Sequence, residues 1–270
     1  MKYQLIALDV DGTLLDDRHQ ITEQTKATIW EAYEQGCKIV LCTGRGPDNA
    51  LPVLQELEME GTMITHNGSA TVHADERGQS VLHEFTFPMS EIVPLVEYAR
   101  REGVHFDVCT SYNMYIERLD ERAKMMYVQY GVNPKLVRDV IDLQIPLVKM
   151  TLSGAAEVLD RVQKEWDEMQ LYGSLRMLRS GDFFIDMMNP AASKGNALRE
   201  LAASWNIGRE HILAIGNYYN DIDMLEFAGL GIAVANSPDE VKAAAGAVTS
   251  SNNDEGVHEA ILRYVLENSD

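Results

Sequence analysis

The first apolar run of the chain ends in two carboxylates, and no other feature restricts the possible fold and function as strongly. Residues 5–8 are all apolar, which is the pattern of a buried strand, and Asp9 and Asp11 follow before Gly12 breaks the pattern. In open α/β sheets ligands bind outside the carboxyl ends of the strands, where these aspartates are expected. An acidic turn at a strand end is the plain alternative. An apolar strand leading into Asp-Val-Asp-Gly-Thr-Leu-Leu is far more restrictive and favours a functional site.

Composition narrows the class of protein. A chain of 270 residues has room for one large domain or two smaller ones, and its composition is that of a soluble globular protein. The formal net charge of -19 argues against a nucleic-acid partner, because phosphate contacts need a basic face. No apolar stretch is long enough for a membrane span, and no signal peptide is expected. Cys37, Cys42 and Cys109 lack metal-ligand spacing, so we expect free buried thiols and a cytoplasmic protein.

Strand and helix patterns alternate regularly at both ends of the chain, and the pattern changes in its middle. This alternation predicts an α/β fold, with a Rossmann-like parallel sheet as the core and helices on both of its faces. The expected core elements are strands at 5–9, 38–42, 62–65, 211–215 and 230–234 and helices at 22–35, 49–57, 193–205, 221–228, 238–245 and 256–266. The middle combines helices at 90–102, 120–130 and 155–170 with strand-like runs at 104–108, 147–152 and 183–187. We therefore expect a core of residues 1–86 and 189–270, interrupted by an inserted α+β domain at 87–188.

Reactive groups follow several of the predicted strands. Thr43, Gly44 and Arg45 follow the second strand, Asn67 and Gly68 the third, Lys194 opens a helix, and the segment from Asn217 to Asp221 follows a later strand. Because the carboxyl ends of parallel strands share one edge, we expect these groups to lie together. They would supply carboxylates, a hydroxyl, an ammonium group and further oxygen ligands. Such a set suits Mg²⁺ and a phosphoryl group.

These motifs resemble those of the haloacid dehalogenase-like hydrolase superfamily, and in particular its Cof-type phosphatase branch, which has a large inserted cap. The matching segments are Asp9-x-Asp11-Gly12-Thr13-Leu14, Thr43-Gly44-Arg45, Thr65-x-Asn67-Gly68, Ser193-Lys194-Gly195 and Gly216-Asn217-x-x-Asn220-Asp221. The resemblance covers the whole core. It implies a phosphoric monoester hydrolase that acts on small phosphorylated metabolites such as sugar phosphates, with Mg²⁺ as cofactor and residues 87–188 as the cap. The oligomeric state stays open.

The resemblance also implies a role for each matching residue. Asp9 would be the nucleophile that forms an aspartyl-phosphate, and Asp11 the general acid and base. The phosphate-binding residues would be Thr43, Gly44, Lys194 and Asn220, the site-shaping residues Gly12, Arg45, Asn67 and Gly68, and the Mg²⁺ ligands Asp9, the main-chain oxygen of Asp11, Asn217 and, in compensation, Asp221. Plain alternatives are a turn hydroxyl for Thr43 and a solvated lysine for Lys194. A cation at a helix N-terminus is electrostatically unfavourable, however, and indicates a nearby anion.

One position departs from the family pattern. The last motif normally begins Gly-Asp, but here it reads Gly216-Asn217, so a metal carboxylate is replaced by an amide. An amide brings no negative charge, and we expect weaker Mg²⁺ binding or slower turnover. A non-catalytic phosphometabolite-binding or regulatory protein and a phosphosugar mutase stay open as alternatives. A dinucleotide enzyme and a serine hydrolase are disfavoured, because the G-x-G-x-x-G and G-x-S-x-G motifs are absent.

Overall fold

Strand β1 (Leu5–Asp9) lies inside an eight-stranded sheet, and all five of its residues are buried. Such a run suits a parallel strand that is covered on both faces. The computed structural model describes residues 2–129 and 131–267. By its contacts the chain divides into two units: a core unit, Met1–Arg45, Ala50–His83 and Ser193–Asp270, and a cap unit, Gly46–Asn49 and Glu84–Ala192.

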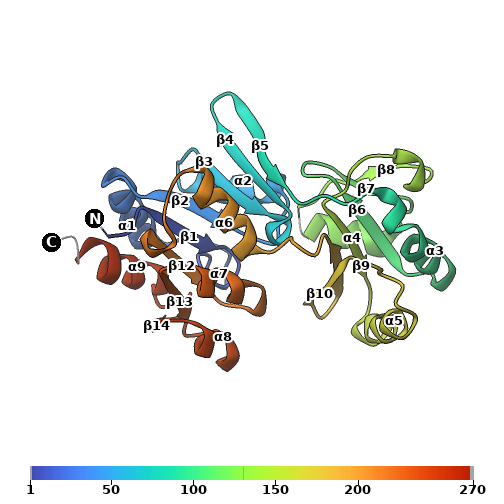
Figure 1. The fold of residues 1–270 in the computed structure, drawn as a ribbon. Coiled ribbons are helices and arrows are strands. Elements are labelled where there is room, and N and C mark those ends of the chain that lie inside the picture. The colour runs from blue at the N-terminus through green and yellow to red at the C-terminus, as the bar shows by residue number, and fades with distance from the viewer. Residues whose placement is uncertain (1, 130, 268–270) are drawn as a thin grey trace. The chain divides into compact units, whose positions relative to one another are not determined.

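The sheet of the core unit has the strand order β14-β13-β12-β1-β2-β3-β4-β5 (Figure 1). From β14 to β3 all neighbouring strands are parallel, and β4 runs antiparallel to β3. The strands are β2 (Lys38–Cys42), β3 (Gly61–Thr65), β4 (Ala70–Asp75), β5 (Gly78–Glu84), β12 (Ile212–Gly216), β13 (Leu230–Val234) and β14 (Ala247–Thr249). The expected parallel sheet is confirmed, and β4 and β5 extend it at one end.

The register of the sheet brings the sequence motifs to one edge. Asp9 pairs with Cys42 on β2, so Thr43 follows directly beyond it. On the other side of β1, Leu8 pairs with Ile215 of β12, and Asn217 lies just past the end of that strand. From β1 the chain builds β2 and β3 on one side and later β12 and β13 on the other, which makes this edge a topological switch point.

Helices of the core unit pack in two groups. α1 (Glu23–Glu34) begins at Thr22, whose side chain accepts a hydrogen bond from the Thr25 N–H, and it packs against α9 (Gly256–Ile261). α6 (Lys194–Ser204) packs against α7 (Ile222–Phe227). The other helices are α2 (Pro47–Glu56) and α8 (Asp239–Ala244). The closing helix, predicted to reach residue 266, is α-helical only to Ile261 and continues as a π-helical segment, η6 (Leu262–Leu266).

The cap unit has its own sheet and its own core. The strand order is β10-β11-β9-β6-β7-β8, with β6 (His105–Cys109), β7 (Met114–Ile116), β8 (Lys135–Leu136), β9 (Lys149–Ser153), β10 (Arg176–Gly181) and β11 (Phe184–Met188). α3 (Val93–Glu102) and α5 (Ala156–Met169) pack on one face, around the buried Tyr98 and Trp166. α4 (Glu121–Gln129) contributes Ala123 and Tyr127 to a smaller cluster.

The elements predicted from the sequence differ from those of the structure mainly at short strands. The domain bounds stay a prediction: the contact unit that contains 87–188 also takes Gly46–Asn49 and the flanking residues 84–86 and 189–192. Strands β7, β8, β10 and β14 were not predicted, because they are short or lie at or next to a sheet edge. The predicted helix 120–130 ends at residue 130, outside the described residues. The three cysteines are buried, as predicted, and form no disulfide among the described residues. In the same part of the chain, no helix combines the length and the apolar character that a membrane span needs.

Candidate active site

Asp9 stands at the end of β1 in a buried cluster of charges. The Lys194 ammonium group donates hydrogen bonds to Asp9 Oδ1 over 2.7 Å and to Asp221 Oδ1 over 2.6 Å. All three side chains are nearly inaccessible to solvent. Asp9 Oδ2 is buried and has no hydrogen-bond partner among the described residues. One oxygen of Asp9 is therefore held in place by a cation, and the other is left open.

The cluster holds two carboxylates and only one ammonium group. Burial, and then the neighbouring charge of Asp221, raise the pKa of Asp9 to about 7, although the contact with Lys194 acts in the opposite direction. Burial alone lowers the pKa of Lys194, but the charges of Asp221 and Asp9 outweigh it and raise that pKa above its ordinary value. The site therefore holds a firmly protonated lysine beside an Asp9 carboxylate that lacks full compensation.

Asp221 supports Lys194 and the loop after β12. Its Oδ1 accepts from Lys194, and its Oδ2 accepts from the main-chain N–H groups of Asn217 over 2.9 Å and Tyr218 over 3.0 Å. The fit requires Gly216, because a Cβ there would lie 2.7 Å from the Asp221 Cβ. Both oxygens of Asp221 are thus already used within the protein. These contacts do not favour the expected role in metal binding, and we propose a positioning role instead.

Thr43 and Arg45 lie beyond β2. The buried Thr43 hydroxyl oxygen accepts from the Arg45 N–H over 3.1 Å, and this leaves the hydroxyl hydrogen available for an anion. The Arg45 side chain makes a bidentate pair with Asp11: Nε donates to Oδ2 over 2.8 Å and Nη2 to Oδ1 over 2.6 Å. Asp11 is half exposed, with 49% of its side-chain surface open to solvent. Arg45 therefore orients the second carboxylate of the pair.

Asn67 connects three of the expected site residues. Its Oδ1 accepts from the Asn220 amide over 3.0 Å, and a Cβ on Gly44 would lie 3.0 Å from the same oxygen. Asn67 has a left-handed backbone, with φ at 55°, and Gly68 follows with φ at +94°. A Cβ on Gly68 would overlap the main chain at Ser193, directly before α6. The close approach of Gly68 to Ser193 therefore sets the position of α6, the helix that carries Lys194.

The oxygen donors near Asp9 fit a magnesium ion. They are the Asp9 carboxylate, the main-chain oxygen of Asp11 and the amide oxygen of Asn217, whose side chain packs so closely on Gly12 that a Cβ there would overlap it. Mg²⁺ accepts one or two carboxylates together with water and substrate phosphate. Among residues 2–129 and 131–267, no three His, Cys, Asp or Glu side chains are placed to hold a metal. Of the three oxygen donors named, only that of Asp9 belongs to a side-chain carboxylate.

Comparison with known proteins shows which family the chain belongs to. A model of the "haloacid dehalogenase-like hydrolase" family matches residues 6–261. The chain belongs to this family. Among curated proteins it is 34% identical to "Putative phosphatase YxeH" of Bacillus subtilis, over 98% of this chain and 99% of that protein. Among solved structures it is similar to a haloacid dehalogenase-like hydrolase from Bacteroides thetaiotaomicron, with a TM-score of 0.86 and 31% identity over 97% of this chain and 99% of that one.

As a member of this hydrolase family the protein is an enzyme, and its class is phosphatase. The solved structure from Thermotoga maritima called TM0651 is also similar, with a TM-score of 0.85 and 27% identity over 97% of each chain. Both structural matches extend over the core and the cap units alike. The fold class predicted from the sequence is therefore confirmed.

Two residues at the site were missed in the sequence. Asp223 Oδ2 accepts from the Gly195 N–H over 3.1 Å and so fixes the first turn of α6 beside Lys194. The Asn236 amide donates to the Gly12 oxygen over 2.8 Å and so holds the loop after β1. Asp223 lies two residues past the last motif, and this short spacing was the only available signal. Asn236 is remote in sequence from its partner, and no local pattern indicates it.

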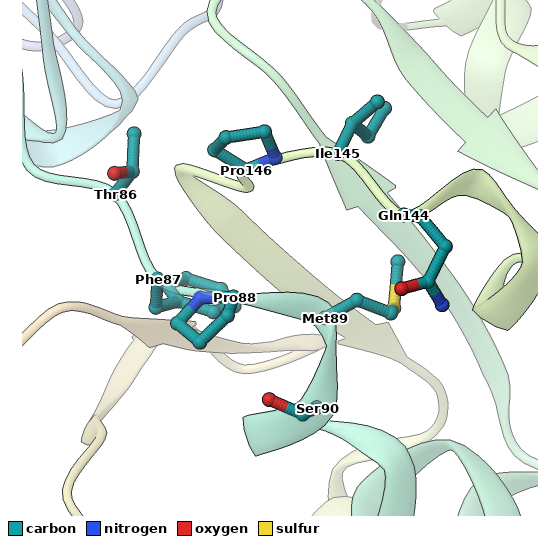
Figure 2. Close-up of a pocket in the computed structure, with 8 residues that line it drawn as sticks. All are labelled: Thr86, Phe87, Pro88, Met89, Ser90, Gln144, Ile145 and Pro146. Carbon is teal, nitrogen blue, oxygen red and sulfur yellow. The ribbon is translucent and has the colours of Figure 1, made fainter.

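The cap unit also has a pocket of about 360 Å³ (Figure 2). None of its lining side chains titrates, and most of them are apolar. They are Thr86, Phe87, Pro88, Met89, Ser90, Gln144, Ile145 and Pro146. The pocket therefore lacks groups for acid–base or nucleophilic chemistry, and the candidate catalytic groups all belong to the core unit.

Gly68→Ala is expected to destabilise the protein by about 2–3 kcal/mol and to lower activity, because the new Cβ collides with main chain and cannot be relieved by a side-chain rotation. Gly36→Ala is the matched control, since Gly36 also has a positive φ, +97°, but its Cβ would meet nothing within 4 Å. The control should cost only about 1 kcal/mol. Urea unfolding of both variants checks this, and equal losses would contradict the close approach of Gly68 to α6.

Proposed function

We propose that the protein is a magnesium-dependent phosphatase that hydrolyses small phosphorylated metabolites, such as sugar phosphates, through an aspartyl-phosphate on Asp9. The observation that carries this proposal is the asymmetry of Asp9, whose Oδ1 is held by Lys194 while Oδ2 is buried without a partner. A nucleophile needs this combination of fixed position and open lone pairs. A protein that only binds phosphate would have no use for a buried, incompletely neutralised carboxylate.

The first half of the reaction transfers the phosphoryl group to the protein. Asp9 Oδ2 attacks phosphorus, the new O–P bond forms, and the bond to the leaving oxygen breaks in line with it. The Asp11 carboxyl group gives its proton to the leaving alkoxide. Thr43 and Lys194 donate hydrogen bonds to the phosphoryl oxygens. A bound magnesium ion would supply charge stabilisation beside Asp9 and Asn217.

The second half returns the protein to its starting state. Asp11, now ionised and held by Arg45, accepts a proton from water, and this water attacks phosphorus. The bond between phosphorus and Asp9 breaks, and inorganic phosphate leaves. The bidentate pair suits this ionised form of Asp11, so we propose that substrate binding loosens Arg45 from Asp11 before the first half begins.

Asn217 sets the metal requirement in this proposal. Asn217→Asp adds a negative charge among the oxygen donors and should lower the Mg²⁺ concentration for half-maximal activity by about 10-fold or more. Phosphate release at increasing Mg²⁺ checks this, and calorimetric Mg²⁺ binding without substrate provides a second readout. Asn206→Asp, an exposed position past the end of α6, is the matched control that adds the same charge elsewhere. Equal Mg²⁺ dependence of the unchanged chain and Asn217→Asp would contradict the role of residue 217.

A substrate panel tests the activity itself. It includes an aryl phosphate, several sugar phosphates and 5-amino-6-(5-phospho-D-ribitylamino)uracil, since a Bacillus subtilis relative named as a phosphatase of that compound is 28% identical to this chain. The expected result is Mg²⁺-dependent release of phosphate. If neither this chain nor the Asn217→Asp variant releases phosphate from any substrate of the panel, the alternative of a phosphometabolite-binding protein is favoured. We also propose a reducing compartment such as the cytoplasm, since none of the three buried cysteines is in a disulfide among the described residues.

A further inference from the structure

Two exposed tyrosines, Tyr218 and Tyr219, come directly after Asn217 in the last sequence motif. They are 45% and 48% exposed. Single apolar side chains are ordinary on a protein surface, but large rings that group together indicate a contact with something else. The two rings contact each other edge to face, with their centroids 5.0 Å apart and their planes at 75°. They therefore form one exposed aromatic surface, called here the tyrosine pair.

The tyrosine pair lies at the sheet edge that carries the candidate catalytic groups. Tyr218 follows the end of β12, and its N–H donates to Asp221 Oδ2 over 3.0 Å. The other oxygen of Asp221 accepts from Lys194, which also donates to Asp9. Three successive hydrogen bonds, all within the core unit, thus join Tyr218 to the proposed nucleophile. This is the edge at which open α/β sheets bind their ligands.

Contacts on two sides hold the tyrosine pair in place. The main chain of Tyr218 is held from β12 as described, and the Tyr219 hydroxyl donates to Glu240 Oε2 on α8 over 3.2 Å. The loop between β13 and α8 is tied to the loop after β1, because the Asn236 amide donates to the Gly12 oxygen. A surface that is positioned before its ligand arrives loses less conformational entropy on binding. The pair therefore has the fixed position that a ring-binding surface needs.

We propose that the tyrosine pair binds an aromatic ring in the leaving group of the substrate and so favours phosphomonoesters that carry such a ring. The inference rests on the proposed phosphatase function and adds a binding surface on the core unit. Aromatic rings attract each other in offset-stacked and edge-to-face geometry beyond the effect of buried area. The exposed carboxylates of Glu240 and its neighbour Asp239 disfavour a leaving group that carries a second anionic group.

Matched substrates test the proposal without any mutation. Phenylalkyl phosphates with two to four methylene groups are compared with the cyclohexylalkyl phosphates of the same length, which are primary alkyl esters of nearly the same shape. A surface that binds only apolar bulk favours the more hydrophobic cyclohexyl ring. We expect kcat/KM to be about 5-fold higher for the phenyl compound of the best length, mainly through KM. Equal kcat/KM at every length, or a preference for cyclohexyl, would overturn the proposal.

The double variant Tyr218→Leu, Tyr219→Leu then tests the residues. It keeps apolar side chains but removes both rings, and the preference for phenyl should fall below about 2-fold. The double variant Tyr218→Phe, Tyr219→Phe keeps both rings and should keep the preference. A preference that survives the change to leucine, or that is lost with phenylalanine, would overturn the proposal. Tyr218→Leu alone provides the same test if the double leucine variant does not fold.

Tyr33→Leu is the matched control for these variants. Tyr33 lies on α1, is 42% exposed, and also makes an edge-to-face pair, with Trp30 at 5.4 Å between centroids. The control removes an exposed, paired ring of the core unit away from the candidate catalytic groups. It should leave the preference for phenyl unchanged. Loss of the preference in Tyr33→Leu would show that it does not depend on the tyrosine pair and would overturn the proposal.

Failure of the proposed function gives a different result. In that case no substrate is hydrolysed by the unchanged chain or by Asn217→Asp, and this inference falls with the proposed function. Turnover of the phenyl and cyclohexyl compounds without discrimination leaves the phosphatase intact and overturns only the role of the tyrosine pair.

Discussion

Asp9→Asn is expected to lower kcat by at least about 10,000-fold, because loss of a nucleophile removes the covalent route altogether. The change is nearly isosteric, and the Asn carbonyl oxygen can still accept from Lys194. KM should change little, since Thr43 and Lys194 continue to bind the phosphoryl group. Phosphate release at saturating Mg²⁺ measures the effect.

The same variant should be more stable than the unchanged chain in the presence of a metal chelator. The pKa of Asp9 is raised to about 7 in the folded protein from an ordinary value of 3.8. The folded state therefore binds this proton more tightly than the unfolded state, and stability falls as the pH rises from about 4 to about 7. Asn cannot ionise, so the stability of the Asp9→Asn variant does not fall in this way as the pH rises. We expect a melting temperature several degrees higher at pH 8, and little difference near pH 4.

Asp17→Asn is the control for both measurements, since it removes an exposed carboxylate that lies outside the proposed catalytic groups. It should keep its activity and show no gain in stability at pH 8. Turnover of Asp9→Asn within about 10-fold of the unchanged chain would contradict the assignment of Asp9 as nucleophile. A lower melting temperature for Asp9→Asn at pH 8 would contradict the account of its burial.

Lys194→Met is expected to destabilise the protein by about 3–5 kcal/mol at neutral pH and to abolish activity. The substitution keeps much of the volume of the side chain but leaves Asp9 and Asp221 buried without their common cation. Burial and the charge of Asp221 raise the pKa of Asp9 to about 7, so Asp9 can be neutralised by protonation and the destabilisation should shrink as the pH falls. Urea unfolding between pH 5 and 8 measures the effect.

Lys26→Met is the matched control, because Lys26 makes only surface ion pairs, with Glu23 over 3.4 Å and Glu56 over 3.7 Å. Such pairs contribute about 0–1 kcal/mol. Adding Asp9→Asn to Lys194→Met should restore part of the lost stability, because it removes one of the two unpaired charges. Equal stability of the Lys194→Met and Lys26→Met variants would contradict the proposed charge cluster.

Much of the fold could be predicted because its signals are local. The apolar run of β1 and the helical pattern at 22–35 are signals within a few residues, and the structure confirms both elements as β1 and α1. β8 has only two residues and β14 only three, too few for a recognisable period. β10 is an edge strand whose residues are mostly half-buried, so its apolar face is not distinct in the sequence.

The sequence was enough to predict which residues belong to the candidate site, but not which contacts they make with one another. Strand ends and motifs indicated Asp9, Thr43 and Lys194, because a parallel sheet brings such positions to one edge. The bidentate pair of Asp11 with Arg45 and the full use of both Asp221 oxygens depend on loop conformations that no local pattern determines.

The most direct test of the account is to trap the covalent intermediate. The enzyme, in the Asn217→Asp background, is mixed with excess substrate and Mg²⁺, quenched in acid after a single turnover, digested and analysed by mass spectrometry. The account predicts one phosphoryl group on the peptide that contains Asp9, and none on the same peptide from an Asp9→Asn enzyme. Release of phosphate in step with substrate loss, with no phosphorylated Asp9 at any quench time, would contradict it.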